Sequence, residues 1–524
     1  MRLFDSLEMK PGELPPAVVS HTAAAKWFPA LSTGQAAAVV LLALVWLARS
    51  SLPLDVGGWW SQLGAGRIFA AQAASTGWQG GLASARQVRP GWAGDLALYG
   101  AWAVAGSEGL VLLGTALFTL SAALLLVALR LRGASWGLAA TLSGAALVGV
   151  AAALPGGGAV FGLLGLAALA TLLAAGVRRP AVLWSTPALL CAWANLDASF
   201  VWGAAWLVAW GIGRAFDVRW EVAEIAASSG LPWPSGSLDQ TPRGRSLGRT
   251  SRWREPAVAV LGVAACAVQP QGFQGVLAAW QSVSELAWQI AKAPGALVWF
   301  VSLLVATAVL ARRSPRRVPF AEGFVVALAF VAALANAIWL PLLAVAWVWA
   351  AAPHWQVLAA RRGSEPGEPS ATKTSIALAA VFLAIMWSPS SRFLLGAPPR
   401  PVGQMMTSGA PLALSAELEE RGLAGNAFYS PGWADYLGWR SSNQLLPLVN
   451  DLVPRSQGVW RDAAAIGAAN HGWLEIADHY QLRYLIVGRG ESPELAGAVQ
   501  REKRCRVLYQ DQQGLLVELL PAPK

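Results

Sequence analysis

The chain has 524 residues, of which 55% are hydrophobic and only 13% are charged, with a formal net charge of +10. Soluble domains carry about 25% charged residues, so this composition excludes an ordinary soluble protein and predicts an integral membrane protein. The positive charge does not indicate nucleic-acid binding, because most of the arginines lie in short clusters between long apolar runs. Arginines in such positions orient a protein in the membrane.

The apolar runs predict a polytopic α-helical bundle of about eleven spans, since about 20 apolar residues cross a 30 Å hydrocarbon core. The transmembrane domain covers 35–391 and follows a polar, cytoplasmic N-terminal segment, 1–34. Its first run is expected to be a signal anchor rather than a cleavable signal peptide. The predicted spans are 35–49, 108–129, 134–154, 158–177, 180–195, 199–215, 256–269, 295–311, 318–336, 338–357 and 375–389.

The basic clusters predict the orientation of these spans. If the N-terminus is cytoplasmic, every short basic cluster falls on the cytoplasmic side, as the positive-inside rule requires. We therefore expect a protein of the inner (cytoplasmic) membrane with an extracytoplasmic C-terminus. The segment 318–357 must then be a hairpin of two spans, because it would make about 60 Å of helix if it were continuous. A single span there would move the C-terminal domain to the cytoplasm.

Three stretches are predicted to lie outside the membrane. The external segment 50–107 is Trp-rich and amphipathic, and is expected to form short helices on the membrane surface. The cytoplasmic loop 216–255 is rich in Pro, Ser, Gly and Arg, a composition typical of disorder. In the C-terminal segment 392–524, short β-type runs alternate with helical runs, which predicts a small extracytoplasmic α/β domain of three-layer type.

The elements of this C-terminal domain are predicted from residue pattern. The predicted strands are Asn426–Ser430, Leu445–Asn450, Tyr484–Gly488, Cys505–Tyr509 and Gly514–Leu519, and the predicted helices are Trp433–Trp439, Gly472–Tyr480 and Glu494–Glu502.

Several local motifs follow one another along the chain. They are Trp59–Arg67, Trp92–Tyr99, Trp193–Asp197 with Gly203, Gln269–Gly272, Ser430–Leu437 and Trp473–Val487. In this order and with these gaps, the chain resembles bacterial polytopic proteins of the GT-C glycosyltransferase-like superfamily, which are similar to protein O-mannosyltransferases and lipid A aminoarabinose transferases. The resemblance runs from about residue 50 to the end of the chain.

The resemblance implies a transferase that takes a sugar from a polyprenyl-phosphate carrier at the outer membrane face. Such chemistry needs a carboxylate in the first external segment, either as general base or as ligand of a divalent metal on the phosphate. It also needs cations for the leaving phosphate. The chain departs from the pattern at four polar positions, which here are Gly58, Gln62, Asp197 and Gln269.

Three carboxylates are candidates for the catalytic role. Asp55 lies three residues before the vacated position at Gly58, and Asp95 lies where the family-like pattern also carries an acid. Asp197 would belong to an external polar cluster, because a carboxylate at the bilayer centre costs about 2.5–3.5 kcal/mol. Each has a structural alternative: Asp55 as a turn residue that caps a surface helix, Asp95 as a helix-surface carboxylate, and Asp197 as part of the turn of a helical hairpin.

The candidate substrate-binding residues are Arg67, Asn195, Gln62 and Trp60. Arg67 is the expected phosphate ligand, since a guanidinium binds phosphate with two parallel hydrogen bonds. Its alternative role is that of an interfacial side chain whose charge reaches the headgroups. The histidines and cysteines are scattered and predict no metal ligand set or disulfide framework.

Two functions remain open on the sequence alone. The first is transfer of a lipid-linked sugar; the second is a non-catalytic membrane protein of the same fold, whose outer domain binds a partner or glycan. A secondary transporter is less favoured, because no paired, Gly/Pro-interrupted spans repeat in the two halves. A transferase further predicts that 50–107 folds over the spans near 193–203, with the C-terminal domain capping the site and Trp433 or Tyr436 at its rim.

Overall fold

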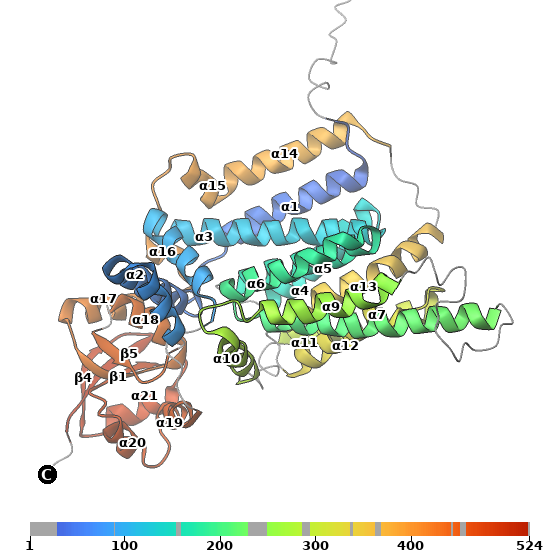
Figure 1. Ribbon diagram of the computed structural model, residues 1–524. Coiled ribbons are helices and arrows are strands. Elements are labelled where there is room, and N and C mark those ends of the chain that lie inside the picture. The colour runs from blue at the N-terminus through green and yellow to red at the C-terminus, as the bar shows by residue number, and fades with distance from the viewer. Residues whose placement is uncertain are drawn as a thin grey trace, which may run out of the picture.

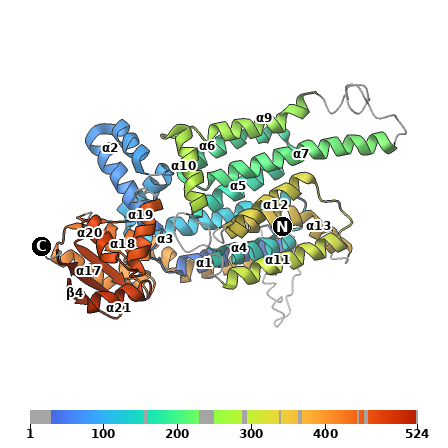
Figure 2. The ribbon, with the colours of Figure 1, turned by 90° about the horizontal axis from the view of Figure 1, so that it is seen from below.

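The computed structural model describes residues 29–88, 90–153, 159–228, 249–285, 294–335, 339–361, 368–441, 444–450 and 457–521. These residues form a long bundle of helices with a sheet-containing domain at one end (Figure 1). We call this the domain end of the bundle, and the other the opposite end. The same arrangement is seen in the view turned by 90° (Figure 2).

Each predicted apolar segment lies largely on a helix, because a helix satisfies the backbone hydrogen bonds of a segment that lipid surrounds. The helices are α1 (Thr33–Ser51), α3 (Trp92–Leu131), α4 (Trp136–Ala153), α5 (Ala159–Arg178), η2 (Pro180–Ser185), α6 (Thr186–Leu196), α7 (Phe200–Ser228), α9 (Arg249–Ala265), α10 (Gly272–Glu285), α11 (Pro294–Arg313), α12 (Phe320–Ala335), α13 (Leu340–Arg361) and α14 (Ala371–Trp387).

Several of these helices are apolar enough to cross a membrane. Within the described ranges, α1, α3, α13 and the part of α5 from Val160 also have the necessary length, and α4, α12 and α14 contain shorter apolar helices. The chain is therefore an α-helical integral membrane protein by length and composition. The predicted hairpin of 318–357 is present as two helices, α12 and α13, that pack against each other.

The predicted surface segment 50–107 forms α2 (Trp59–Val88) and the first part of α3. Helix α2 changes direction at Gly77, whose φ of 77° suits a residue without a side chain. Helix α3 bends at Ala105 and Gly106, where Gly106 has a φ of 57°. This bend separates the predicted surface segment from the predicted span 108–129.

The loop expected over 216–255 is shorter than predicted. Helix α7 continues to Ser228 and α9 begins at Arg249, so only 229–248 lies outside the described residues. In the first residues of this extension, the Asp217 carboxylate accepts hydrogen bonds from the backbone N–H groups of Phe320 and Ala321 at 2.7 and 3.1 Å. Those groups lack helical partners at the start of α12, and composition alone does not reveal that contact.

Buried charged side chains join several helices at the opposite end. Arg132, after α3, forms an ion pair with Glu322 of α12, and both side chains are at most 9% exposed. The Arg132 guanidinium also lies 4.2 Å from the Trp349 ring of α13. His354 of α13 lies 3.8 Å from the Glu322 carboxylate and 2.8 Å from the Ser314 hydroxyl.

The C-terminal domain contains one mixed five-stranded sheet. The strand order is β2-β1-β3-β5-β4, with β1 parallel to β2 and β3, and β5 antiparallel to β3 and β4. All five predicted strands are present, although β2 is shorter than predicted. The strands are β1 (Gly425–Tyr429), β2 (Leu445–Pro447), β3 (Tyr484–Gly488), β4 (Cys505–Gln510) and β5 (Gly514–Leu519).

Helices cover both faces of this sheet, as a three-layer domain requires. On one face, Tyr429 and Ile486 pack with Leu414 and Leu437 of α17 (Leu412–Arg421) and α18 (Ala434–Arg440). On the other, Phe428 and Leu485 pack with α19 (Gln457–Gly467), α20 (Trp473–His479) and α21 (Pro493–Arg501). Of these helices, α17 and α19 were not predicted.

The linker before the C-terminal domain is attached to the bundle by backbone hydrogen bonds and an ion pair. The linker leaves the membrane helices through α15 (Pro389–Leu394) and α16 (Val402–Met405). The backbone of Leu54, just after α1, bonds with Met405 and Thr407 at 2.6 and 2.9 Å. Arg400 of the linker forms an ion pair with Glu108 at the bend of α3, in which Arg400 Nη2 lies 2.9 Å from Glu108 Oε2.

Candidate functional site at the junction of α2, α3 and α18

Helix α2 lies unusually close to α3, and a glycine permits this. A Cβ on Gly66 would lie 2.3 Å from the carbonyl oxygen of Asp95 and 2.7 Å from Cβ of Tyr99. The glycine is therefore needed for the two helices to meet. Asp95, on the α3 side of this close approach, is only 2% exposed.

An aromatic cluster joins these two helices to α18 of the C-terminal domain. The Trp60 ring packs edge-on against Trp102 at 5.6 Å and Tyr436 at 5.0 Å. Trp439 of α18 lies 5.9 Å from Trp102 and 6.5 Å from Tyr99. Such edge-to-face geometry is favourable for aromatic pairs, so the cluster fixes the domain on the bundle.

Arg67 completes the partly exposed side of this cluster. Its guanidinium carbon lies 4.2 Å from the centre of the Trp439 ring, a cation–π contact. Partial burial lowers the pKa of Arg67, and the nearby Tyr99 acts in the opposite direction. Trp60 is buried, whereas Tyr99, Trp102, Trp439 and Arg67 each keep part of their surface exposed. We call these four half-buried side chains the aromatic–arginine surface.

The structure places Asp55 at the start of α2, near the base of the cluster. Its backbone carbonyl accepts a hydrogen bond of 2.9 Å from Trp60 Nε1. Burial raises the pKa of the Asp55 carboxyl, while the Gly57 N–H and the Arg49 charge oppose this rise. The position agrees with the expected turn before a surface helix.

Asn195 and Asp197 lie at the end of α6, where α3 begins. Asn195 Oδ1 accepts a hydrogen bond of 2.7 Å from Trp92 Nε1, and its Nδ2 donates to the Val268 carbonyl at 2.8 Å. Asp197 Oδ2 accepts hydrogen bonds from the Ser199 N–H and hydroxyl just before α7. Gly91, the residue before α3, and Gly94, in its first turn, lie close to the backbone of residues 196–197. The start of α3, which belongs to the segment 50–107, thus packs on the end of α6.

Several buried polar atoms at the start of α2 and in the adjoining part of α3 have no hydrogen-bond partner among the described residues. They are Asp55 Oδ1, Trp59 Nε1, Gln62 Oε1 and Thr115 Oγ1. Buried polar groups are satisfied by protein, water or ligand in nearly all proteins. Similar unpaired atoms, such as Glu322 Oε2 and His354 Nε2, occur elsewhere in the bundle.

The structure brings some of the predicted site residues together and leaves others apart. Trp60 and Arg67 share the aromatic cluster, and Asn195 contacts the start of α3, but no hydrogen bond is described that joins two of the three candidate carboxylates. Trp102, Trp439 and Thr115 also lie at the junction but were not predicted from the sequence. A sequence signal does exist for the aromatic ones: Tyr99 with Trp102, and Tyr436 with Trp439, stand three apart, a spacing that places two side chains on one helix face.

Tyr436, expected near the rim of a cavity, is instead one of the most deeply buried side chains of the cluster. Across the described residues, no three His, Cys, Asp or Glu side chains gather as ligands for a metal ion. In comparisons with known proteins, no family model matches this chain, and no curated protein matches it either.

Proposed function

We propose that the chain is a GT-C-like membrane protein that binds a polyprenyl-phosphate-linked sugar at the outer face of the inner membrane. The observation that carries this proposal is the aromatic–arginine surface at the junction of α2, α3 and α18. A guanidinium can bind phosphate with two parallel hydrogen bonds. The half-buried rings of Trp102 and Trp439 would offer their accessible apolar surface to the C–H side of a sugar ring.

The proposed orientation rests on the distribution of arginine. Eleven spans, with a cytoplasmic N-terminus, would put the C-terminal domain outside the cytoplasm. The basic residues around Arg132 and in 312–317 lie at the opposite end of the bundle, where Arg132, Glu322 and His354 meet. The positive-inside rule favours a cytoplasmic location for that end.

Binding without chemistry is the form of this function that the geometry supports best. Asp197 is occupied in the turn before α7 and Asp95 is 2% exposed. A general base must come within about 2.6–3.2 Å of the proton it removes, or act through one water. Transfer of the sugar to an acceptor is the second candidate function, favoured by one observation: Asp95 stands one helical turn before Tyr99 of the aromatic–arginine surface.

A binding assay tests the proposal. The full chain is reconstituted in nanodiscs and titrated with undecaprenyl-phosphate mannose and, in parallel, with undecaprenyl phosphate. Arg67→Ala and Trp439→Ala are each expected to weaken binding of the mannosyl lipid by roughly tenfold or more, because each removes a charge-assisted or stacking contact. Arg67→Ala should weaken both lipids, whereas Trp439→Ala should weaken the mannosyl lipid more.

Arg483→Ala is the matched control. Arg483 lies in the C-terminal domain, away from Trp439, and makes a similar cation–π contact, 5.3 Å from the Tyr484 ring. Equal affinities of the Arg67, Trp439 and Arg483 variants would refute the proposed site. The chemical step is tested separately with Asp95→Asn. If Asp95→Asn loses mannose release while its lipid binding is unchanged, transfer is established. If the unmodified chain releases no mannose with any acceptor, binding alone is supported.

A further inference from the structure

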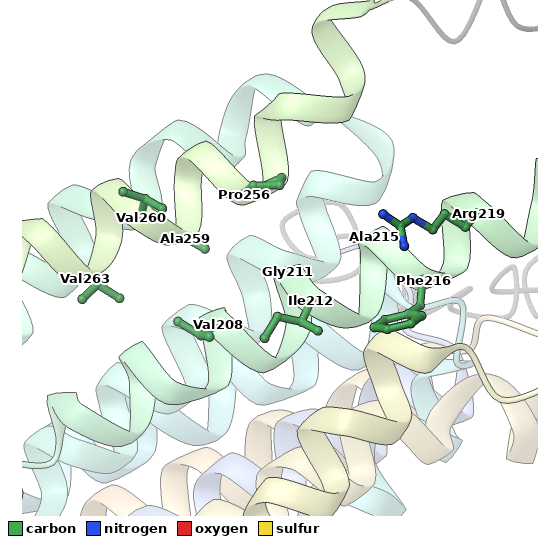
Figure 3. Close-up of a pocket in the computed structure, with 10 residues that line it drawn as sticks. All are labelled: Val208, Gly211, Ile212, Ala215, Phe216, Arg219, Pro256, Ala259, Val260 and Val263. Atoms are coloured by element: carbon green, nitrogen blue, oxygen red, sulfur yellow. The ribbon is translucent and has the colours of Figure 1, made fainter. Parts of the chain in front are cut away.

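A second feature, away from the junction, is an apolar groove between α7 and α9. It encloses about 530 Å³, within the usual size range of small-ligand sites (Figure 3). Its walls are apolar side chains from both helices: Val208, Ile212 and Phe216 of α7, and Pro256, Val260 and Val263 of α9. Most of them are strongly exposed, with Ile212 at 49% and Val260 at 67%.

The groove is open because each helix uses its other side to pack elsewhere. Helix α7 is held to α12 through Gly213, where a Cβ would lie 2.3 Å from Cα of Ala321. Helix α9 packs through Gly262 against Leu190 of α6 and Leu207 of α7, where a Cβ would lie 3.0 and 2.6 Å from these side chains. The floor between α7 and α9 is made by Gly211 and Ala259, whose small size leaves the space above them unfilled.

One cation stands at the end of this apolar groove. Arg219 of α7 lines the groove and is exposed, and it has no hydrogen bond or ion pair with any residue that the structure describes. In Figure 3 its side chain extends back over Ala215, toward the gap between the two helices. The nearby Asp217 does not neutralise it, because that carboxylate accepts the N–H groups at the start of α12.

We propose that this groove binds an anionic glycerophospholipid, with one acyl chain between α7 and α9 and the phosphate on Arg219. The rise from Val208 to Arg219 is about 16 Å of helix. One leaflet of a 30 Å hydrocarbon core is about 15 Å deep, so the apolar length below the guanidinium matches a single acyl chain. Basic pockets between membrane helices are known to hold anionic lipid headgroups.

The shape and charge of the groove favour an acyl chain with an anionic headgroup. A Cβ on Gly211 would lie only 3.5 Å from Cβ of Ala259, so the two helices are in contact along the floor. A polymethylene chain can lie along such a groove, and Arg219 at the end of the groove supplies the positive charge that complements a phosphate headgroup. The lipid site does not depend on the proposed sugar binding, because it uses different helices and the opposite half of the bundle.

Native mass spectrometry of the full chain tests this assignment. The protein is purified from nanodiscs of phosphatidylglycerol and phosphatidylethanolamine, and retained lipids are counted. The unmodified chain should retain phosphatidylglycerol, and Arg219→Ala should retain about fivefold less, the effect expected for one basic residue near an anionic headgroup. Arg219→Gln, a milder change at this exposed position, should give the same loss and guards against misfolding of the first variant.

Two further variants isolate the groove. Ala215→Trp fills the space beneath Arg219 without changing charge and should also lower phosphatidylglycerol retention. Arg313→Ala removes an equivalent exposed charge at the end of α11 and should leave retention unchanged. Equal retention by the Arg219 variants and the unmodified chain, or an equal loss in Arg313→Ala, would overturn the site. Displacement of phosphatidylglycerol by an equal amount of undecaprenyl phosphate would overturn the choice of a phospholipid.

Discussion

The two ends of the helical bundle each contain a buried glutamate paired with an arginine, but in different surroundings. At the opposite end, Arg132 and Glu322 are 9% and 3% exposed, and Trp349 and His354 cover them from α13. At the domain end, Glu108 is 1% exposed but its partner Arg400 is 28% exposed and comes from the linker. The first pair lies wholly within the bundle, and the second joins the bundle to another domain.

The surrounding side chains differ in the same way. Around Arg132, an ion pair, a cation–π contact and a hydrogen-bonded histidine engage residues from several helices. Near Glu108, the start of α2 leaves polar atoms of Asp55, Trp59 and Gln62 without hydrogen-bond partners among the described residues. The opposite end also has buried polar atoms without a hydrogen-bond partner among the described residues, namely Glu322 Oε2 and His354 Nε2. The two ends therefore differ in what the ion pair joins: helices of the bundle at the opposite end, and the bundle with the C-terminal domain at the domain end.

The largest expected effect is at the opposite end. Arg132→Ala and Glu322→Ala should each lower the free energy of unfolding by about 3–5 kcal/mol, because each leaves a buried charge without its partner. Since both side chains are buried, the two losses should be similar. Thermal unfolding in detergent should show a fall in Tm on the order of 10 °C. Arg312→Ala, at an exposed position of the same end, should change stability by no more than about 0.5 kcal/mol.

At the domain end the two truncations should differ. Arg400→Ala leaves the Glu108 carboxylate buried and unpaired, which is expected to cost about 3 kcal/mol. Glu108→Ala should cost less, about 1–2 kcal/mol, because the partly exposed Arg400 can turn toward water. Limited proteolysis of the linker 395–411 measures the release of the domain. Equal cleavage of both variants would mean that the ion pair is not an asymmetric joint between bundle and domain.

Much of the fold follows from local pattern. The apolar runs predict the helices because lipid leaves the backbone no other way to satisfy its hydrogen bonds. The strands are predicted equally well, since β-branched and aromatic runs bounded by Gly and Pro are strong local signals. The extension of α7 to Ser228 was not predicted, because the Pro-, Ser-, Gly- and Arg-rich composition of 216–255 indicated a loop and did not reveal the contact of Asp217 with the start of α12. That contact joins residues far apart in the sequence.

The candidate site could be predicted only in part, for the same reason. The motif Trp59–Arg67 identifies one side of the junction, and the expected folding of 50–107 over α6 agrees with the Trp92–Asn195 hydrogen bond. The contact of Trp60 with Tyr436, and of Arg67 with Trp439, joins two domains that no local pattern places face to face. A one-dimensional pattern can thus name the residues of such a site but not their partners.

The smallest expected effect tests the close approach of α2 and α3 at the junction. Gly66→Ala should lower the free energy of unfolding by about 1–3 kcal/mol, because the new methyl group overlaps the Asp95 carbonyl and one helix must shift. The shift would also move the neighbouring Arg67 away from Trp439. Thermal unfolding measures the first consequence, and binding of undecaprenyl-phosphate mannose in nanodiscs measures the second.

Gly100→Ala supplies the matched control on α3, because a Cβ there would meet no atom within 4 Å. Alanine is favoured over glycine inside a helix by about 0.5–1 kcal/mol, so this substitution should stabilise the chain slightly. The two glycine substitutions are thus expected to change stability in opposite directions. If both are stabilising, α2 is not seated on α3 at Gly66. The aromatic–arginine surface would then lack the fixed geometry that the proposed lipid-linked sugar binding requires.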